Sequence, residues 1–171
     1  MRSAFVSFLA FAVVASLLGC SKSAPPPGKP VKLGSVCNEP DESRVRLEGF
    51  LRYRRGLMSF CSTYGSKKTC DLELYESAER PPDFDLMRPS AGPAPITAKL
   101  SVPVGDGVGE MDELPKKFKG SDIKLHLLSG ANATDGSHII IDGKLSVIPG
   151  DPAKPGAPKS CYVTVEWVSA S

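Results

Sequence analysis

The strongest constraint on the fold is an alternation of apolar and polar side chains that recurs along the chain. In residues 44–53, "RVRLEGFLRY", the apolar side chains of Val45, Leu47 and Leu51 stand at odd positions, and mostly polar side chains stand at even positions. A period of two places the odd-numbered side chains on one face of a strand, so that face is expected to be buried. Further strands are predicted at 69–76, 96–104, 123–128, 138–148 and 160–168. The chain is therefore predicted to be mainly β.

One short helix is predicted at residues 112–118, "DELPKKF". Asp112 can cap its first turn, and Gly120 stands just beyond its end, where helices commonly stop. The chain of 171 residues also contains 16 Gly and 16 Pro, a composition typical of a fold with many turns. Long helices are therefore not expected.

Two of the predicted strands share a pattern that includes a glycine. Residues 45–51, "VRLEGFL", and residues 139–145, "IIIDGKL", both have apolar side chains at the first, third and seventh positions, an acid at the fourth and Gly at the fifth. A glycine inside a strand usually marks a bulge or a bend where a sheet curls. Two bent strands, a short helix before the later strands and a final alternating strand resemble the oligonucleotide/oligosaccharide-binding (OB) fold. The resemblance covers about residues 40–169 and implies a small barrel of five or six strands.

The amino terminus has the architecture of a secretory signal. Arg2 precedes a continuous apolar stretch at residues 4–18, and the small residue Gly19 follows, as a signal peptidase requires. The stretch is shorter than the roughly 20 residues that a helix needs to span a bilayer. A cleaved signal peptide is therefore expected instead of a resident membrane helix.

Residues 17–20, "LLGC", resemble the lipobox of bacterial lipoproteins. The resemblance implies cleavage after Gly19 and lipidation of Cys20, which would anchor the protein in a membrane of the cell envelope. Ser21 follows the cysteine, where an Asp is associated with retention in the inner membrane. The outer membrane is therefore favoured over the inner membrane.

The residues after the proposed cleavage site indicate a tether. Residues 21–36, "SKSAPPPGKPVKLGSV", have no hydrophobic period and are rich in Pro, Gly, Ser and Lys. An extended tether of this length, at about 3.1 Å per residue, would hold a domain roughly 40 to 50 Å from the bilayer. The triple proline could instead be a ligand for an aromatic groove. The expected organisation is a signal peptide at 1–19, a lipidated cysteine with a flexible linker at 20–36, and a β domain at 37–171.

The cysteine count is consistent with an oxidising compartment. Five cysteines are present, and lipidation of Cys20 would leave an even number for disulfides. Pairing Cys61 with Cys70 and Cys37 with Cys161 is one of three connectivities that the sequence leaves open. Two disulfides are therefore predicted.

The best candidate for a binding surface is a group of basic and aromatic residues. Such groups on the face of a barrel can hold phosphates, sugars or bases. The alternative is a solvated strand end with no binding role. The surface comprises Phe50, Arg52, Tyr53, Arg54, Arg55 and Tyr75.

Composition and spacing argue against two classes of function. A formal net charge of +2 is low for a protein that binds nucleic acid, so a nucleic-acid partner is not expected. The two histidines, His126 and His138, have no Cys, Asp or Glu at a spacing typical of a metal site or a catalytic group. No catalytic residue, metal ligand or cofactor is therefore predicted.

These features together predict a lipoprotein whose β domain binds a protein or a small ligand in the cell envelope without catalysis. The alternative is an envelope hydrolase or redox enzyme whose site has no recognisable sequence pattern.

Overall fold

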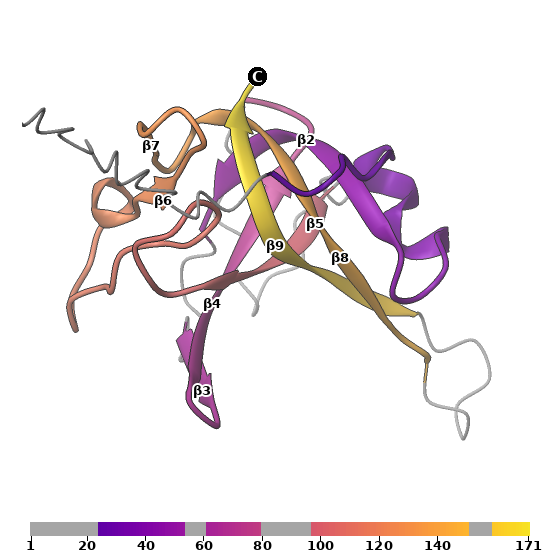
Figure 1. The fold of residues 1–171 in the computed structure, drawn as a ribbon, viewed down its shortest axis with the longest axis horizontal. Helices are drawn as coiled ribbons and strands as arrows, with labels where there is room; N and C mark the ends of the chain where they lie inside the picture. The colour runs from indigo at the N-terminus through magenta and orange to yellow at the C-terminus, as the bar shows by residue number, and fades with distance from the viewer. Residues whose placement is uncertain (1–23, 54–60, 80–96, 151–158) are drawn as a thin grey trace, which may run out of the picture.

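The structure is a computed structural model that describes residues 24–53, 61–79, 97–150 and 159–171 (Figure 1). Its long strands are β2 (Arg44–Arg52), β4 (Lys67–Tyr75), β5 (Thr97–Pro103), β8 (His138–Ile148) and β9 (Ser160–Ala170). The short elements are the strands β1 (Lys29–Pro30), β3 (Cys61–Tyr64), β6 (Leu125–His126) and β7 (Asn132–Ala133), and the 3-10 helices η1 (Leu33–Asn38) and η2 (Gly120–Asp122). The prediction of a mainly β chain is confirmed.

The five long strands form a closed ring. β8 lies between β2 and β9 in antiparallel pairings, and β4 pairs antiparallel with β5. β5 and β9 pair in parallel, with Leu100 opposite Val163. The ring closes because the end of β2 also pairs with β4, where Phe50 lies opposite Tyr75. Figure 1 shows the long β8–β9 pair running past β4 and β5.

Alternating side chains of the ring strands fill its interior. Val45, Leu47 and Leu51 of β2 are fully buried, in agreement with the predicted inward face. Burial of each such aliphatic side chain contributes about 1.5–3 kcal/mol to folding. The segment between β5 and β8 adds Met111 and Ile123 to the same core. One continuous core therefore joins the ring to this segment.

The two glycines of the shared strand pattern lie where backbones approach closely. A Cβ on Gly143 would lie 2.4 Å from the carbonyl oxygen of Thr164, and β8 and β9 shift register between Asp142 and Gly143. A Cβ on Gly49 would lie 2.5 Å from the carbonyl oxygen of Tyr75, beside the point where β2 meets β4. Neither position has room for a larger residue. The predicted irregularity at Gly143 is therefore present.

Both predicted disulfides form. Cys61 and Cys70 are direct partners in the β3–β4 hairpin. The Cys37–Cys161 bridge joins η1 to the beginning of β9 across 124 positions of sequence. Of the three connectivities that the sequence allows, the fold selects this one because it brings these pairs of Cα atoms within 4.0 and 5.5 Å.

The helix predicted at residues 112–118 is wrong. Met111 and Asp112 donate their backbone N–H groups to the carbonyl oxygens of Pro103 and Lys124, which are distant in sequence. Pro115 also disfavours a helical backbone at the preceding residue, Leu114. The strand predicted at 123–128 is reduced to β6, which pairs with β7 outside the ring.

The expected boundary between linker and domain, at residue 37, is also wrong. β1 pairs in parallel with β2, and η1 buries Leu33 and Val36 in the core. The proline-rich composition concealed this docking because a short extended segment can pair with a strand edge without any hydrophobic period of its own. The predicted signal peptide and Cys20 lie outside the described residues.

Candidate functional site

A groove of about 450 Å³ lies over the outer face of β4 and β5. Cys70, Leu72 and Leu74 of β4 point into the core, so the intervening residues Asp71 and Glu73 point outward. In the β4–β5 register, Asp71 lies opposite Ser101 and Glu73 lies opposite Lys99. The residues that line the groove are Ser62, Thr69, Asp71, Leu72, Glu73, Lys99, Leu100, Ser101 and Tyr162.

The groove combines hydroxyl groups, charges of both signs and one aromatic ring. Partial desolvation raises the pKa of the Asp71 carboxyl above its ordinary value, and the positive charge of Lys99 opposes this rise. Glu73 accepts a hydrogen bond of 2.6 Å from the Tyr75 hydroxyl, which holds its carboxylate in place. Tyr162, on β9, is 37% exposed and offers a ring face. Such a set can exchange hydrogen bonds with a polar ligand and pack against its apolar part.

The predicted basic and aromatic surface is only partly assembled. Phe50 and Arg52 lie opposite Tyr75 and Glu73, so Phe50, Arg52 and Tyr75 share one outer face. Tyr53 is separate from them: it packs against the core and against Phe118, with ring centroids 5.8 Å apart. The remaining two predicted residues, Arg54 and Arg55, lie outside the described residues.

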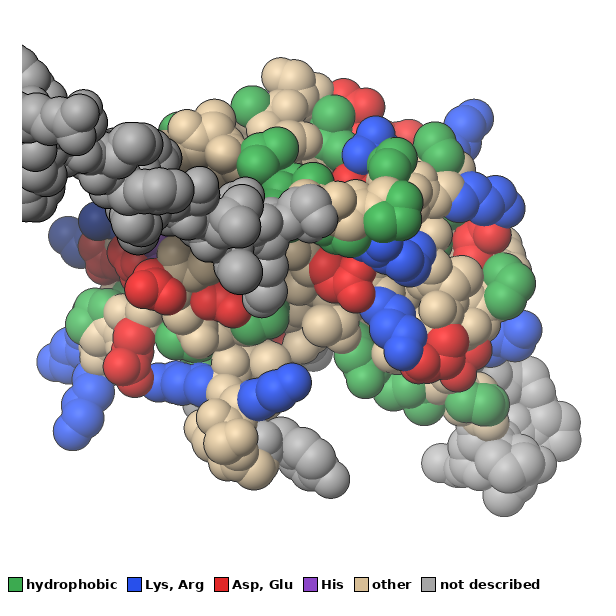
Figure 2. Space-filling view, in the orientation of Figure 1, with side chains coloured by type: hydrophobic (Ala, Val, Ile, Leu, Met, Phe, Trp, Pro, Cys, Tyr) green, Lys and Arg blue, Asp and Glu red, His purple; other side chains and the backbone are tan. Residues whose placement is uncertain are grey.

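This outer face carries acidic as well as basic groups. Phe50 stacks on His138 with ring centroids 4.4 Å apart. Arg52 donates a hydrogen bond of 2.6 Å to the carbonyl oxygen of Ala78, and Glu48 lies 3.8 Å from His138. Lys, Arg, Asp and Glu side chains are also interspersed over the face of the molecule seen in Figure 2. The described part of the predicted surface therefore lacks the positive excess that a phosphate-binding face needs.

Two pairs of histidine and carboxylate, which the sequence spacing did not reveal, form through strand register. His126 Nε2 lies 2.9 Å from Asp112 Oδ1. The second pair is Glu48 and His138. Glu48 lies between His138 and Ser171, because it also accepts a hydrogen bond from the Ser171 hydroxyl. In a serine triad the histidine, not the acid, contacts the hydroxyl. The Ser171, Glu48 and His138 arrangement therefore does not match that mechanism.

Neither the comparison with protein-family models nor the comparison with curated proteins finds a match for this chain. Within the described residues, His, Cys, Asp and Glu side chains do not gather in groups of three that could hold a metal ion. The same residues include no helix of the length and apolar character that crossing a membrane requires. Function is therefore inferred from the ring and its groove.

Proposed function

We propose that this protein is a lipid-anchored lipoprotein of the bacterial cell envelope, with the outer membrane as its favoured location. Its β domain binds a ligand and performs no chemistry on it. The disulfides support an oxidising compartment. They also engage four of the five cysteines, which leaves Cys20 as the cysteine outside both bridges. A thiol with no disulfide partner next to an apolar leader is what lipidation at Cys20 requires.

We also assign the ring to the OB fold. Along the chain, the five ring strands come in the order β2, β4, β5, β8 and β9, and we number them first to fifth in that order. Around the ring they follow one another as β2, β8, β9, β5 and β4, which is first, fourth, fifth, third and second. The third and fifth strands are parallel. This order and this parallel pair support an OB fold, in which the segment between β5 and β8 carries the short 3-10 helix η2 and the β6–β7 pair instead of an α-helix.

The groove over β4 and β5 is the single observation that carries the binding role. OB folds bind oligosaccharides and oligonucleotides over the face of their second and third strands, which here are β4 and β5. Asp71 and Glu73 place two carboxylates in the lining of the groove, and carboxylates repel the phosphates of a nucleic acid. The hydroxyl groups and the Tyr162 ring suit a saccharide better. We therefore infer that the ligand is an oligosaccharide.

Binding to an oligosaccharide array tests this function. The chain from Cys20 onward should bind at least one saccharide, and Asp71→Asn should weaken that binding by about tenfold or more, because a hydrogen bond to a charged group contributes about 1.5–3 kcal/mol. Tyr162→Ala should weaken it as well, because the variant loses the ring against which a sugar can pack. The matched control is Leu128→Ala, since Leu128 is 53% exposed but does not line the groove. Absence of binding to every saccharide, or unchanged binding by both groove variants, would contradict the proposal.

The groove could instead receive a segment of an envelope protein. Crosslinking in cells separates the two ligand classes, because a protein partner would be captured with the wild-type chain and lost with Tyr162→Ala. A saccharide ligand would leave the captured proteins the same for wild type and variant.

A further inference from the structure

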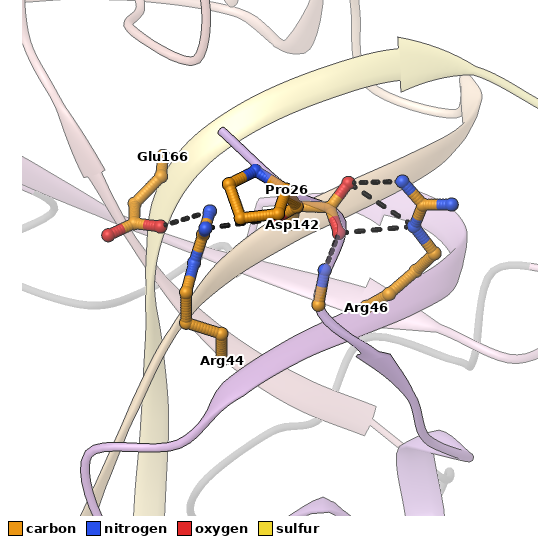
Figure 3. A network of polar contacts seen from close by, with 6 residues as sticks. Pro26, Arg44, Arg46, Asp142 and Glu166 are labelled. Atoms are coloured by element: carbon orange, nitrogen blue, oxygen red, sulfur yellow. Dashed lines mark hydrogen bonds and ion pairs between the residues drawn. The ribbon is translucent and has the colours of Figure 1, made fainter. Parts of the chain in front are cut away.

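Asp142 carries the one buried charge among the described side chains. Its neighbour Ile141 points into the core, so Asp142 lies on the outer face of β8, yet it is only 5% exposed. It is covered because the segment before β1 crosses this face, and the backbone N–H of Gly28 donates a hydrogen bond of 2.7 Å to Asp142 Oδ1. Arg46 donates to both carboxylate oxygens of Asp142, the shortest of these bonds being 2.7 Å (Figure 3). The carboxylate therefore holds the segment and is itself neutralised.

Further contacts fasten the same segment, residues 26–31, which we call the strap. Arg44 donates a hydrogen bond of 2.9 Å to the carbonyl oxygen of Pro26 and forms an ion pair of 2.8 Å with Glu166 (Figure 3). A Cβ on Gly28 would lie 2.5 Å from the backbone of Val45, so only glycine fits there. Val31 donates its N–H to the carbonyl oxygen of Arg46. The strap is therefore held against β2 along its whole length.

This fastening shortens the chain that can separate a lipid on Cys20 from the domain. Pro26 stands six positions after Cys20, a span of about 20 Å when fully extended. Without the strap contacts, the first residue held in the core would be Leu33, thirteen positions after Cys20, and the span would reach about 45 Å. The long tether expected from composition is therefore mostly part of the domain.

Three cations at the strap, Lys29, Arg44 and Arg46, are paired with carboxylates, whereas Lys32 just beyond the strap is exposed. Lys29 forms an ion pair of 2.7 Å with Glu39, Arg44 with Glu166, and Arg46 with Asp142. Paired charges offer little net attraction to an anionic lipid surface. The length of free chain, and not electrostatic attraction, then sets the distance from the bilayer.

We propose that the strap, fastened by Asp142, holds this domain against the membrane surface with the β2–β8–β9 face nearest to the lipid. The proposal rests on the proposed lipid anchor at Cys20. It predicts that release of the strap moves the domain away from the bilayer although the ring stays folded.

The test attaches the chain from Cys20 onward to vesicles of phosphatidylcholine through a maleimide lipid. Cys20 is the cysteine outside the disulfides, so it provides the point of attachment whether or not cells lipidate it. The single tryptophan, Trp167, lies opposite Asp142 in the β8–β9 pairing. Energy transfer from Trp167 to a dansyl lipid therefore reports the distance of the strap face from the membrane.

Transfer should be efficient for wild type and should fall several-fold for Gly28→Ala, whose added methyl group displaces the strap. Asp142→Asn, which weakens the same fastening, should lower transfer as well. Lys32→Ala is the matched control, because it changes an exposed side chain just after the strap and should leave transfer unchanged. Circular dichroism and thermal melting check that each variant is folded. Adding phosphatidylserine to the vesicles should not change the wild-type result.

A Gly-Ser insertion before Ala24 that doubles the chain between Cys20 and Pro26 should lower transfer with the strap still fastened. The proposal is overturned if this insertion lowers transfer but folded Gly28→Ala and Asp142→Asn match wild type. It is also overturned if the insertion has no effect, since another contact would then hold the domain. Failure of Cys20 to incorporate palmitate in cells would reject the anchor but would leave the result on coupled vesicles intact, so the two failures are distinguishable.

Discussion

At the scale of single residues, Asp71 is an exposed carboxyl whose pKa is raised by partial desolvation in the groove. Asp71 is partly desolvated, and its neutral outward-facing neighbours Thr69 and Ser101 would tolerate an uncharged side chain in its place. Ionisable groups that are kept in unfavourable surroundings are found more often at functional sites than elsewhere. Under the proposed function, Asp71 is therefore the groove residue at which stability and binding are expected to conflict.

Asp71→Asn should raise the urea midpoint at pH 7. Burial raises the pKa of the folded carboxyl above its unfolded value, so the folded state binds the proton more tightly. The ionised group then lowers stability at every pH above the folded pKa, and the penalty shrinks as the pH falls through that value. The gain of the variant should vanish below the ordinary aspartate pKa of about 3.9. Urea titrations at pH 7 and pH 3 check this, and an equal gain at both pH values would refute it.

The two strand glycines give a second test at this scale. Gly49→Val and Gly143→Val should each destabilise the domain by about 1–3 kcal/mol, because a Cβ at either position would meet a backbone oxygen at 2.5 Å or less. Thr164→Val on the outer face of β9 is the control and should be nearly neutral. Urea unfolding of the three variants measures the differences. Wild-type stability in both glycine variants would mean that the strands can separate at these positions without loss.

At the scale of elements, the two disulfides act on very different loops. The Cys61–Cys70 bridge closes a hairpin that its own cross-strand pairing already defines. The Cys37–Cys161 bridge instead joins the start of the domain to its last strand and encloses nearly all of the ring. Since the entropy lost by the unfolded chain grows with loop length, the second bridge should matter more.

Replacement of each pair by serine should therefore destabilise the domain unequally. Loss of Cys37–Cys161 should cost about 5 kcal/mol and loss of Cys61–Cys70 about 2.5 kcal/mol, from the dependence of loop entropy on length. Denaturant unfolding of the two double variants compares them under identical conditions. An equal loss in both would show that loop entropy does not dominate these bridges.

At the scale of the whole molecule, the strap and the groove occupy different parts of the ring. The strap lies on β2 and contacts Asp142 of β8, whereas the groove lies over β4 and β5 with Tyr162 of β9 at its border. The strap contacts centre on β2 and β8 and the groove on β4 and β5, while β9 contributes Glu166 to the first and Tyr162 to the second. Under the proposed function, a lipid at Cys20 and a ligand in the groove can be held at the same time.

Cys20→Ser should abolish both palmitate labelling and retention in the membrane fraction, since Cys20 is the proposed site of the lipid anchor. The ring and its disulfides should be unaffected, because Cys20 takes part in neither described bridge. Palmitate labelling of cells, with fractionation and mass spectrometry of the alkylated unreduced protein, measures all three properties. Persistent label in the variant would rule out Cys20 as the lipidated residue.

The sequence by itself determined the local features of this protein. The alternation at residues 44–53, 138–148 and 160–168 located β2, β8 and β9, because a period of two is a property of consecutive residues. The same period already placed Tyr53 on the face opposite Phe50 and Arg52, so their separation could have been anticipated. An even number of cysteines beyond Cys20 also indicated two bridges.

Only the tertiary structure decided which distant segments meet. Strand register determines four of these contacts. They are the Phe50–Tyr75 pairing that closes the ring, the choice of disulfide partners, the docking of the strap on Asp142, and the groove that joins β4, β5 and β9. Strand register is set by the requirement that the inner faces of all strands are buried together. The pattern within one strand does not contain this information, so it cannot predict the register. Asp142 illustrates this, since its sequence context resembles that of Glu48. The strap covers Asp142, which is buried and holds the strap, whereas Glu48 is exposed.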